Sequence, residues 1–397
     1  MKNIFLVVCV FAFAATAFGQ PESKVIGQAR SLIADKKYES AYKALDAEDP
    51  KNNNPEIVLL KEEIVLKYFI TSIMHQMFAL KDLEKNEDIM DYRGKEGSFG
   101  MYVFAPDSVL TRLIKKHPDN YKLYKGLGDF YYDVNLKYPG QWLKEEEELQ
   151  RLINKNYQIA IDHGLGDDHV FYALGYILLS NKQNKEAIPY FLQSIALKND
   201  FADAHYNLAY AYLFTDDREN AIKYAKNAID LYKEPELKSD AARIVAQAYV
   251  ELHDDKNAAI YYEAANTIDT GNYENIKPML DLYVRTGNPK RADALNAFFL
   301  LAPEKPTIYN NLADIYMGYD KTDELISFLK SKLPVYETQK NIYGNLHFYL
   351  GKLYLVSDKK TAKQYFLKAK DIFSTVYEKD HAVFKALDEG IEEAETK

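Results

Sequence analysis

The sequence predicts an all-α fold, a solenoid in which helix-turn-helix units stack on one another. The main observation is a set of positions that recurs after 34 residues without slippage. Leu174, Gly175, Leu178, Ala187 and Ser194 are followed at that interval by Leu208, Ala209, Tyr212, Ala221 and Ala228. A period of this length is typical of a helical pair that buries its apolar face against the next pair. Two further observations support the same fold: the register continues along the chain, and small residues recur at equivalent positions in successive units.

The register continues along the chain in both directions. The next copy lies 37 residues further on, after the longer connection 233–240, and the copies after it follow at spacings of 34 and 33. The equivalent positions are Val245, Ala246, Tyr249, Ala258 and Ala265; Met279, Leu280, Tyr283 and Ala292; Leu312, Ala313 and Tyr316; Leu350, Gly351 and Tyr354; and, upstream, Leu127, Gly128 and Tyr131. Most of the chain is therefore one array of repeats.

Small residues occupy equivalent positions in successive units. Gly175, Ala209 and Ala246 recur where two helices must approach closely, and Tyr or Leu fills the neighbouring gap. Such a pattern is what ridge-into-groove packing between helices requires.

At these positions the chain resembles the tetratricopeptide-repeat family. The family pattern has a large residue, then Leu-Gly and Tyr in the first helix, followed by Ala, an aromatic residue and Ala in the second. Phe171, Leu174, Gly175, Ala187 and Phe191 match it, and the resemblance extends over about residues 120 to 378. It implies a right-handed superhelical α-solenoid.

The first 19 residues are typical of a secretory signal peptide. Lys2 precedes an apolar run from Ile4 to Phe18, and Ala17-Phe18-Gly19 supplies a small-x-small cleavage pattern. We expect cleavage before Gln20, because a run of about 15 residues is shorter than the roughly 20 that span a bilayer. The mature protein is then exported, periplasmic or secreted, without a transmembrane segment and without cysteine, since Cys9 is the only one.

Residues 20–85 are expected to form an N-terminal helical region with a degenerate repeat. A hairpin over 23–47 ends at the turn 49–55, where Pro and Asn are concentrated. A long apolar helix is expected from Glu56 to about Lys85, packed against the first repeats as a cap or spacer.

Residues 86–107 interrupt the helical pattern and form a predicted insertion. Gly94, Gly97 and Gly100 alternate there with aromatic residues. Long irregular segments of this kind are often functional. The sequence leaves two alternatives open, a binding lid and a structural connection that folds its aromatic residues onto the array.

The repeat array itself is expected over 108–381. Within it, Trp142 is interpreted as a packing anchor or, alternatively, a ligand platform, and Glu145–Glu148 as a helix start stabilised by the helix dipole. A C-terminal capping helix and tail follow over 382–397, because apolar residues recur there at helical spacing on an otherwise acidic segment.

The composition and motifs exclude several classes of function. The 50 basic and 59 acidic residues give a net charge of −9, and no basic stripe suitable for nucleic acid is present. None of the eight histidines lies at metal-ligand spacing or beside a Ser or Asp that suggests a nucleophile, and no phosphate-binding Gly-rich motif occurs. We therefore predict no catalytic residues, no metal and no cofactor.

The remaining candidate is the inner surface of the solenoid, which the first helix of each repeat lines. In the family's register the candidate binding residues are Tyr172, Tyr176, Tyr206, Asn207, Tyr210, Phe214, Arg243 and Lys277. The aromatic residues among them combine a large apolar face with low entropic cost of ordering. They are expected to form a wall that becomes polar and charged along the array.

The sequence thus favours a non-enzymatic scaffold. Its partner is predicted to be a protein or an extended peptide held in the concave groove, in an envelope or secretion assembly. The alternative is a carbohydrate-binding protein that stacks sugars on the Tyr-rich surface. A third hypothesis, an enzyme with its site in the insertion 86–107, has no motif in its favour.

Overall fold

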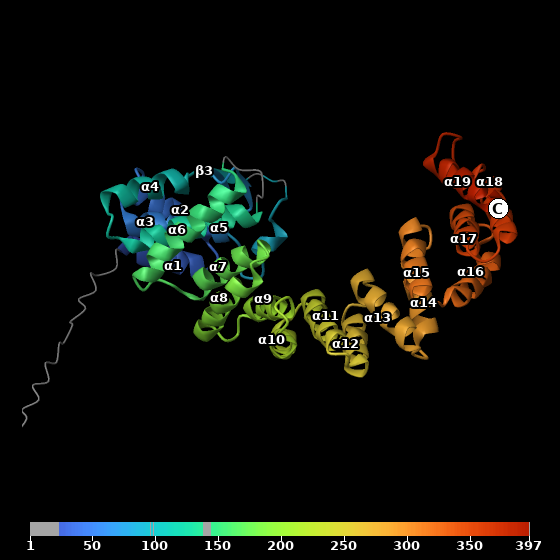
Figure 1. Cartoon of the computed structure of the whole chain (residues 1–397). Coiled ribbons are helices and arrows are strands. Elements are labelled where there is room, and N and C mark those ends of the chain that lie inside the picture. Colours follow the sequence, from blue (N-terminus) through green and yellow to red (C-terminus); the bar gives the residue numbers. More distant parts are fainter. Residues whose placement is uncertain (1–23, 96, 98, 138–143, 397) are drawn as a thin grey trace, which may run out of the picture. The chain divides into compact units, whose positions relative to one another are not determined.

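The computed structural model describes residues 24–95, 97, 99–137 and 144–396. The predicted signal peptide and Trp142 therefore lie outside the described residues. The chain divides into two compact units, Met1–Ile177 and Leu178–Lys397, called here the first and second units. Figure 1 shows that both consist mainly of helices that follow one another as neighbours. The predicted helix-turn-helix solenoid is confirmed.

The first unit begins with three helices and continues with three more after a small sheet. They are α1 (Lys24–Ala34), α2 (Tyr38–Glu48), α3 (Pro55–Lys67), α4 (Pro106–Lys116), α5 (Tyr121–Lys137) and α6 (Glu146–Asp162), and the boundary between the units lies within α7 (Asp168–Ser180). Side chains of α1 and α2, including Ala29 and Leu45, are fully buried. Gly128 of α5 lies so close to α6 that a Cβ atom there would be 2.6 Å from the Tyr157 ring.

A three-stranded antiparallel sheet replaces the second half of the long helix expected from Glu56 to about Lys85. Helix α3 ends at Lys67. Strands β1 (Thr71–Ile73), β2 (Met77–Leu80) and β3 (Gly100–Val103) follow in that order, with Thr71 opposite Ala79 and Ala79 opposite Met101. The helix prediction was wrong there because a short apolar run suits a strand or a buried helix equally well.

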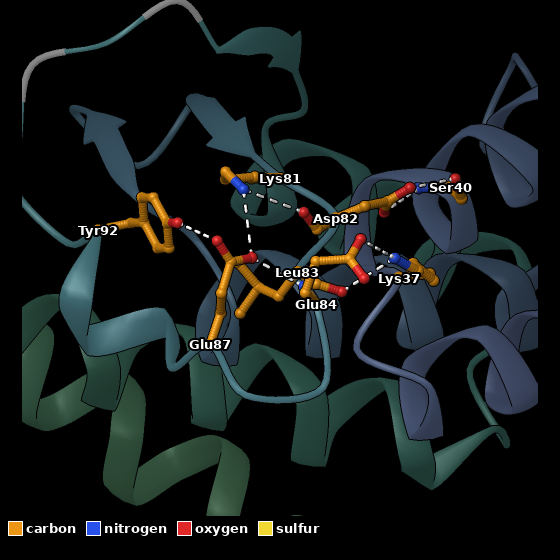
Figure 2. A network of polar contacts seen from close by, with 8 residues as sticks. All are labelled: Lys37, Ser40, Lys81, Asp82, Leu83, Glu84, Glu87 and Tyr92. Carbon is orange, nitrogen blue, oxygen red and sulfur yellow. Dashed lines mark hydrogen bonds and ion pairs between the residues drawn. The ribbon is translucent and has the colours of Figure 1, made fainter.

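The segment after β2 is attached to the first helical hairpin by a polar network (Figure 2). The Ser40 hydroxyl donates to Asp82 at 2.5 Å, and the Lys37 ammonium donates to the Leu83 carbonyl at 3.0 Å and pairs with Glu84 at 3.2 Å. In the same network Tyr92 donates to Glu87. The short 3₁₀ helix η1 (Ile89–Asp91) lies between Glu87 and Tyr92.

The aromatic residues at the end of the insertion pack onto the first hairpin. The Tyr102 ring lies 5.0 Å from the Tyr42 ring, and its hydroxyl donates to Glu39 at 2.5 Å. Phe104 is 2% exposed beside the same Tyr42. These contacts favour a structural connection for this part of the insertion, which was one of the two alternatives.

The second unit continues as a row of helices packed on their neighbours. They are α8 (Asn184–Leu197), α9 (Ala202–Leu213), α10 (Arg218–Leu231), α11 (Pro235–Glu251), α12 (Asp255–Ile268), α13 (Tyr273–Thr286), α14 (Arg291–Leu300), α15 (Pro306–Gly318), α16 (Thr322–Tyr336), α17 (Lys340–Tyr354), α18 (Lys359–Phe373) and α19 (Ala382–Glu395). Ala209 and Ala246 are fully buried, as expected of close helix contacts. Among the described residues, no helix combines the length and apolar character needed to cross a bilayer.

Pairs of tyrosines stack between the two helices of a hairpin in the second unit. The ring centroids are 5.7 Å apart for Tyr212 and Tyr224, and 5.8 Å apart for Tyr249 and Tyr261. Lys226 of α10 lies 5.3 Å from the Tyr261 ring, which belongs to the next hairpin. Part of the high tyrosine content is therefore used for packing within and between repeats.

Candidate partner-binding surface

Helix α9 presents the most exposed of the predicted aromatic residues. Tyr210 is 37% exposed, and Phe214, at the C-cap of the helix, is 57% exposed. Their ring centroids are 4.6 Å apart, as expected for residues one helical turn apart. Together they form an apolar surface that no other part of the second unit covers fully.

Tyr206 lies one turn before Tyr210 and is half-buried. Its ring meets the Tyr232 ring edge-on at 6.2 Å. Burial raises the pKa of the Tyr206 hydroxyl, and the Asp240 carboxylate raises it further, whereas Arg243 lowers it. The hydroxyl therefore stays protonated at neutral pH and is able to donate a hydrogen bond.

Arg243 of α11 adds a charged side chain to the surface formed by the aromatic residues of α9. It is half-buried and pairs with Asp240, one turn earlier, at 2.9 Å. Since both residues act on the pKa of Tyr206, they lie close to that side chain. We call Tyr206, Tyr210, Phe214 and Arg243 the α9–α11 surface.

Lys277 lies one repeat further, on α13. It is half-buried, and its ammonium is 5.9 Å from the Tyr273 ring. Among the described residues it has no carboxylate partner within ion-pair distance. Its charge is thus available to a ligand, although no contact joins it to the α9–α11 surface.

The other predicted residues are placed differently. Asn207, expected on the exposed face, is only 8% exposed, because one residue after Tyr206 the helix has turned about 100° toward its neighbours. Tyr172 and Tyr176 of α7 are half-buried, with ring centroids 6.1 Å apart. They belong to the first unit, so a continuous wall with α9 stays a prediction.

The more distant polar positions of the array are engaged in contacts with one another. Gln247 donates to Glu251 at 3.1 Å, and Glu251 also pairs with Arg218. Arg285 pairs with Asp255 at 2.7 Å. These side chains stabilise neighbouring helices, which leaves the α9–α11 surface as the more accessible part of the predicted site.

The structure also brings together a Ser-His-Asp group that the sequence analysis missed. Ser72 Oγ lies 3.0 Å from His75 Nδ1, and His75 Nε2 lies 2.9 Å from Asp133 Oδ2. The sequence analysis found no histidine in a Ser or Asp arrangement that suggests a nucleophile, and it did not predict these contacts of His75. Asp133 is 58 residues away in sequence, so no local motif signals the contact. His75 is 0% exposed, and the group ties the β1–β2 turn to α5.

The described residues contain no group of three or more His, Cys, Asp or Glu side chains that could hold a metal ion.

Comparison with known proteins places two of the repeats. The sequence matches the tetratricopeptide repeat family over residues 168–201 and 202–235, which confirms the predicted resemblance and includes α9. No curated protein matches the chain.

Several solved structures are similar in outline. A tetratricopeptide repeat protein from Parabacteroides merdae is 16% identical, with a TM-score of 0.41, over 69% of this chain and 99% of that one. The C-terminal part of a TPR repeat-containing protein from Cytophaga hutchinsonii is 14% identical, with a TM-score of 0.42, over 72% and 93%. YrrB, described as a TPR protein with an unusual peptide-binding site, is 15% identical, with a TM-score of 0.33, over 59% and 97%.

Proposed function

We propose that this chain, which carries tetratricopeptide repeats, is a non-enzymatic scaffold that binds an extended peptide or a protein segment on its α9–α11 surface. The observation that carries the proposal is the exposed pair Tyr210 and Phe214, close to Tyr206 and Arg243. Aromatic residues and Arg are the residue types that dominate binding energy at protein interfaces. Stacked repeats commonly supply extended binding surfaces of this kind.

The chemistry of this surface favours a segment with an apolar anchor. The exposed rings of Tyr210 and Phe214 offer apolar area that a partner side chain can cover. The protonated Tyr206 hydroxyl is a hydrogen-bond donor for a backbone carbonyl. Arg243 is paired with Asp240, and the two charges neutralise each other. The surface therefore has little attraction for an acidic partner.

Site-specific photo-crosslinking tests the proposal. A photoreactive phenylalanine analogue replaces Phe214 in the producing cell, and its adducts are identified by mass spectrometry. A matched protein carries the analogue at Leu300, which is 53% exposed on α14 and outside the surface. We expect an adduct with one protein at position 214 and not at position 300, and its loss when Tyr210→Ala is added.

The opposite outcomes are equally clear. Equal adducts at both positions, or an adduct that survives Tyr210→Ala, would place the contact elsewhere. Retention of the protein on immobilised polysaccharide, lost in Tyr210→Ala, would replace the peptide by a glycan. Circular dichroism of each variant must match the parent, so that lost binding is not lost folding.

We propose, in addition, that the protein is exported to the periplasm or beyond and works in an envelope or secretion assembly. The apolar run after Lys2 and the Ala17-Phe18-Gly19 pattern support this proposal. Amino-terminal sequencing of the protein from its own source should begin at Gln20. A chain that begins at Met1 or is recovered with cytoplasmic proteins would contradict export.

A further inference from the structure

A pocket of about 360 Å³ lies beside β1 in the first unit. Phe69 and Ile70, which connect α3 to β1 and are 5% and 1% exposed, line its floor, and Ser72 of β1 lines it as well. Arg93 and Lys137 contribute two cations from segments far apart in sequence. A concave, mostly apolar site with a few converging polar groups is the usual form of a small-molecule site.

The two cations lie against the same ring. The Arg93 guanidinium carbon is 4.3 Å from the Phe69 ring centroid, and the Lys137 ammonium is 4.8 Å from it. Arg93 donates to the backbone carbonyls of Phe69 at 3.2 Å and Lys67 at 2.9 Å. It has no carboxylate partner among the described residues.

Lys137, in contrast, pairs with Asp133 at 2.5 Å. Of the two cations at the pocket, one is thus neutralised by a carboxylate and one is not. The pocket keeps an excess of one positive charge on a protein whose net charge is −9. A monoanion complements that charge, whereas a dianion would leave a negative charge in a partly apolar site.

The surrounding structure holds these groups in place. Arg93 follows Tyr92, which Glu87 and Lys81 fix in the network of Figure 2. The next residue, Gly94, has a φ of +74°, and its N–H donates to the Ile70 carbonyl at 3.0 Å. The segment therefore closes over β1 through a backbone conformation that suits glycine.

The Ser72 hydroxyl is held by a hydrogen bond with His75. Asp133 accepts a hydrogen bond from His75 Nε2, and Ser72 Oγ lies 3.0 Å from Nδ1 of the same ring. Met74 and His75 both have positive φ, +47 and +52, which non-glycine residues adopt at a cost. Two hydrogen bonds and full burial of His75 hold this turn in shape.

We infer that this pocket binds a monocarboxylic acid with an apolar body about the size of one amino-acid residue. Arg93 and Lys137 receive the carboxylate, and the apolar body lies in the part of the pocket that Phe69, Thr71 and Gly94 line. Such a ligand is either a free acid or the carboxyl-terminal residue of a peptide, and both present the same chemistry. The site lies in the first unit, whereas the α9–α11 surface lies in the second.

Calorimetric titration of the mature chain tests the inference with two matched probes. N-acetyl-phenylalanine carries the carboxylate, and N-acetyl-phenylalaninamide is the same molecule without the charge. We expect the acid to bind with a dissociation constant on the order of 0.1–1 mM and at least about tenfold more tightly than the amide. The peptide Ala-Ala-Phe then separates the sources: binding as tight as the acid indicates a peptide terminus, and weaker binding a free acid.

Variants assign the binding to the pocket. Arg93→Gln should weaken binding of the acid by about tenfold or more, as expected for a charge-assisted hydrogen bond. Lys95→Gln is the matched control. The substitution removes the same charge two residues later in the chain, and Lys95 lines a neighbouring pocket instead. It should change the affinity by less than about twofold.

Several results would overturn the inference. They are equal affinity for acid and amide, no binding of the acid at about 10 mM, unchanged binding in Arg93→Gln, or tighter binding of phenyl phosphate than of the acid. If Arg93→Gln lowers the melting temperature, Lys137→Gln provides a second variant with the same expected loss. Binding that survives in both variants would place the ligand elsewhere.

Discussion

Single buried charges in the first unit show how one residue organises its surroundings. Lys61 of α3 is 0% exposed, yet its ammonium pairs with Asp46 and donates a hydrogen bond to the Asn52 amide oxygen, each at 2.6 Å. The rings of Tyr42 and Phe104 lie 5.1 Å and 5.3 Å from the same ammonium. A buried charge is tolerated only with such complete pairing. Lys61 therefore joins α2, α3 and the end of the insertion.

Replacing Lys61 tests this role. Lys61→Ala should lower the free energy of unfolding by about 3 kcal/mol, because it leaves a cavity and removes contacts from three elements. Lys43→Ala, whose side chain is 59% exposed in an ion pair with Glu39, should change it by less than about 1 kcal/mol. Urea unfolding followed by circular dichroism measures both, and equal losses would contradict the role assigned to Lys61.

Glu62, the next residue, is buried, and no described residue lies within ion-pair distance of its carboxyl group. Its Oε1 accepts no hydrogen bond from the described residues. Burial raises its pKa well above the usual value of 4.5, Asp129 and Asp133 raise it further, and Lys125 lowers it. The carboxyl therefore keeps its proton in the folded chain at pH values where the unfolded chain has lost it.

This raised pKa predicts a pH dependence of stability. The contribution of Glu62 is complete below the unfolded pKa near 4.5 and is lost as the pH rises through the folded pKa. Glu62→Gln should remove that loss and stabilise the chain at neutral pH by about 1–2 kcal/mol. Unfolding curves measured at pH 5 and pH 8 give the answer, with the exposed Glu56→Gln as control. A variant whose stability falls with pH as steeply as the parent would refute the prediction.

At the scale of elements, the distance between two helices is set by which residue faces the contact. Gly351 of α17 lies where a Cβ atom would be 2.7 Å from the ring of Phe366 on α18. That ring is 1% exposed and packs in the same cluster as Leu387 of α19. It has no free space to move into, so the glycine is required for the contact.

The substitution Gly351→Ala should therefore destabilise the chain by about 1–3 kcal/mol. Gly318→Ala is a matched control at the end of α15, where an added Cβ atom meets nothing within 4 Å. It should be neutral or stabilising by up to about 1 kcal/mol, because alanine favours the helix. Thermal unfolding of the two variants under one condition compares them, and a stable Gly351→Ala would contradict the packing argument.

At the scale of the whole molecule, a repeat protein distributes its stability among neighbouring repeats. Helix α19 packs on α18 through the cluster of Phe366, Phe373 and Leu387. It covers the apolar face that the last hairpin would otherwise expose. The consequence of losing α19 should be local, because distant repeats share no contact with it.

Hydrogen exchange on a truncated chain tests this locality. Deletion of residues 382–397 should reduce amide protection in α17 and α18 and leave α9 to α12 unchanged. A chain that lacks only residues 396 and 397 serves as the control, since α19 ends at Glu395. Loss of protection along the entire second unit would show that its repeats unfold as a single cooperative body.

The sequence predicted the repeats well because their information is local and periodic. Small and aromatic residues recur at fixed intervals, and the structure buries them as expected, for example at Ala209, Ala246 and Phe191. It also predicted the helical positions of Tyr206, Tyr210 and Arg243. Asn207 was misplaced, because a register taken from spacing alone has an error of one position, and one position turns a helical residue by about 100°.

The sequence alone therefore determined the helix-turn-helix array, whose contacts join residues close in the chain. Only the tertiary structure decided the sheet at residues 71–103, the pairing of Lys61, and the meeting of His75 with Asp133. It also decided that Arg93 and Lys137 flank one ring. These contacts join residues that are far apart in the sequence and do not follow the repeat spacing. Strand pairing and side-chain pairing over such separations produce no local sequence pattern.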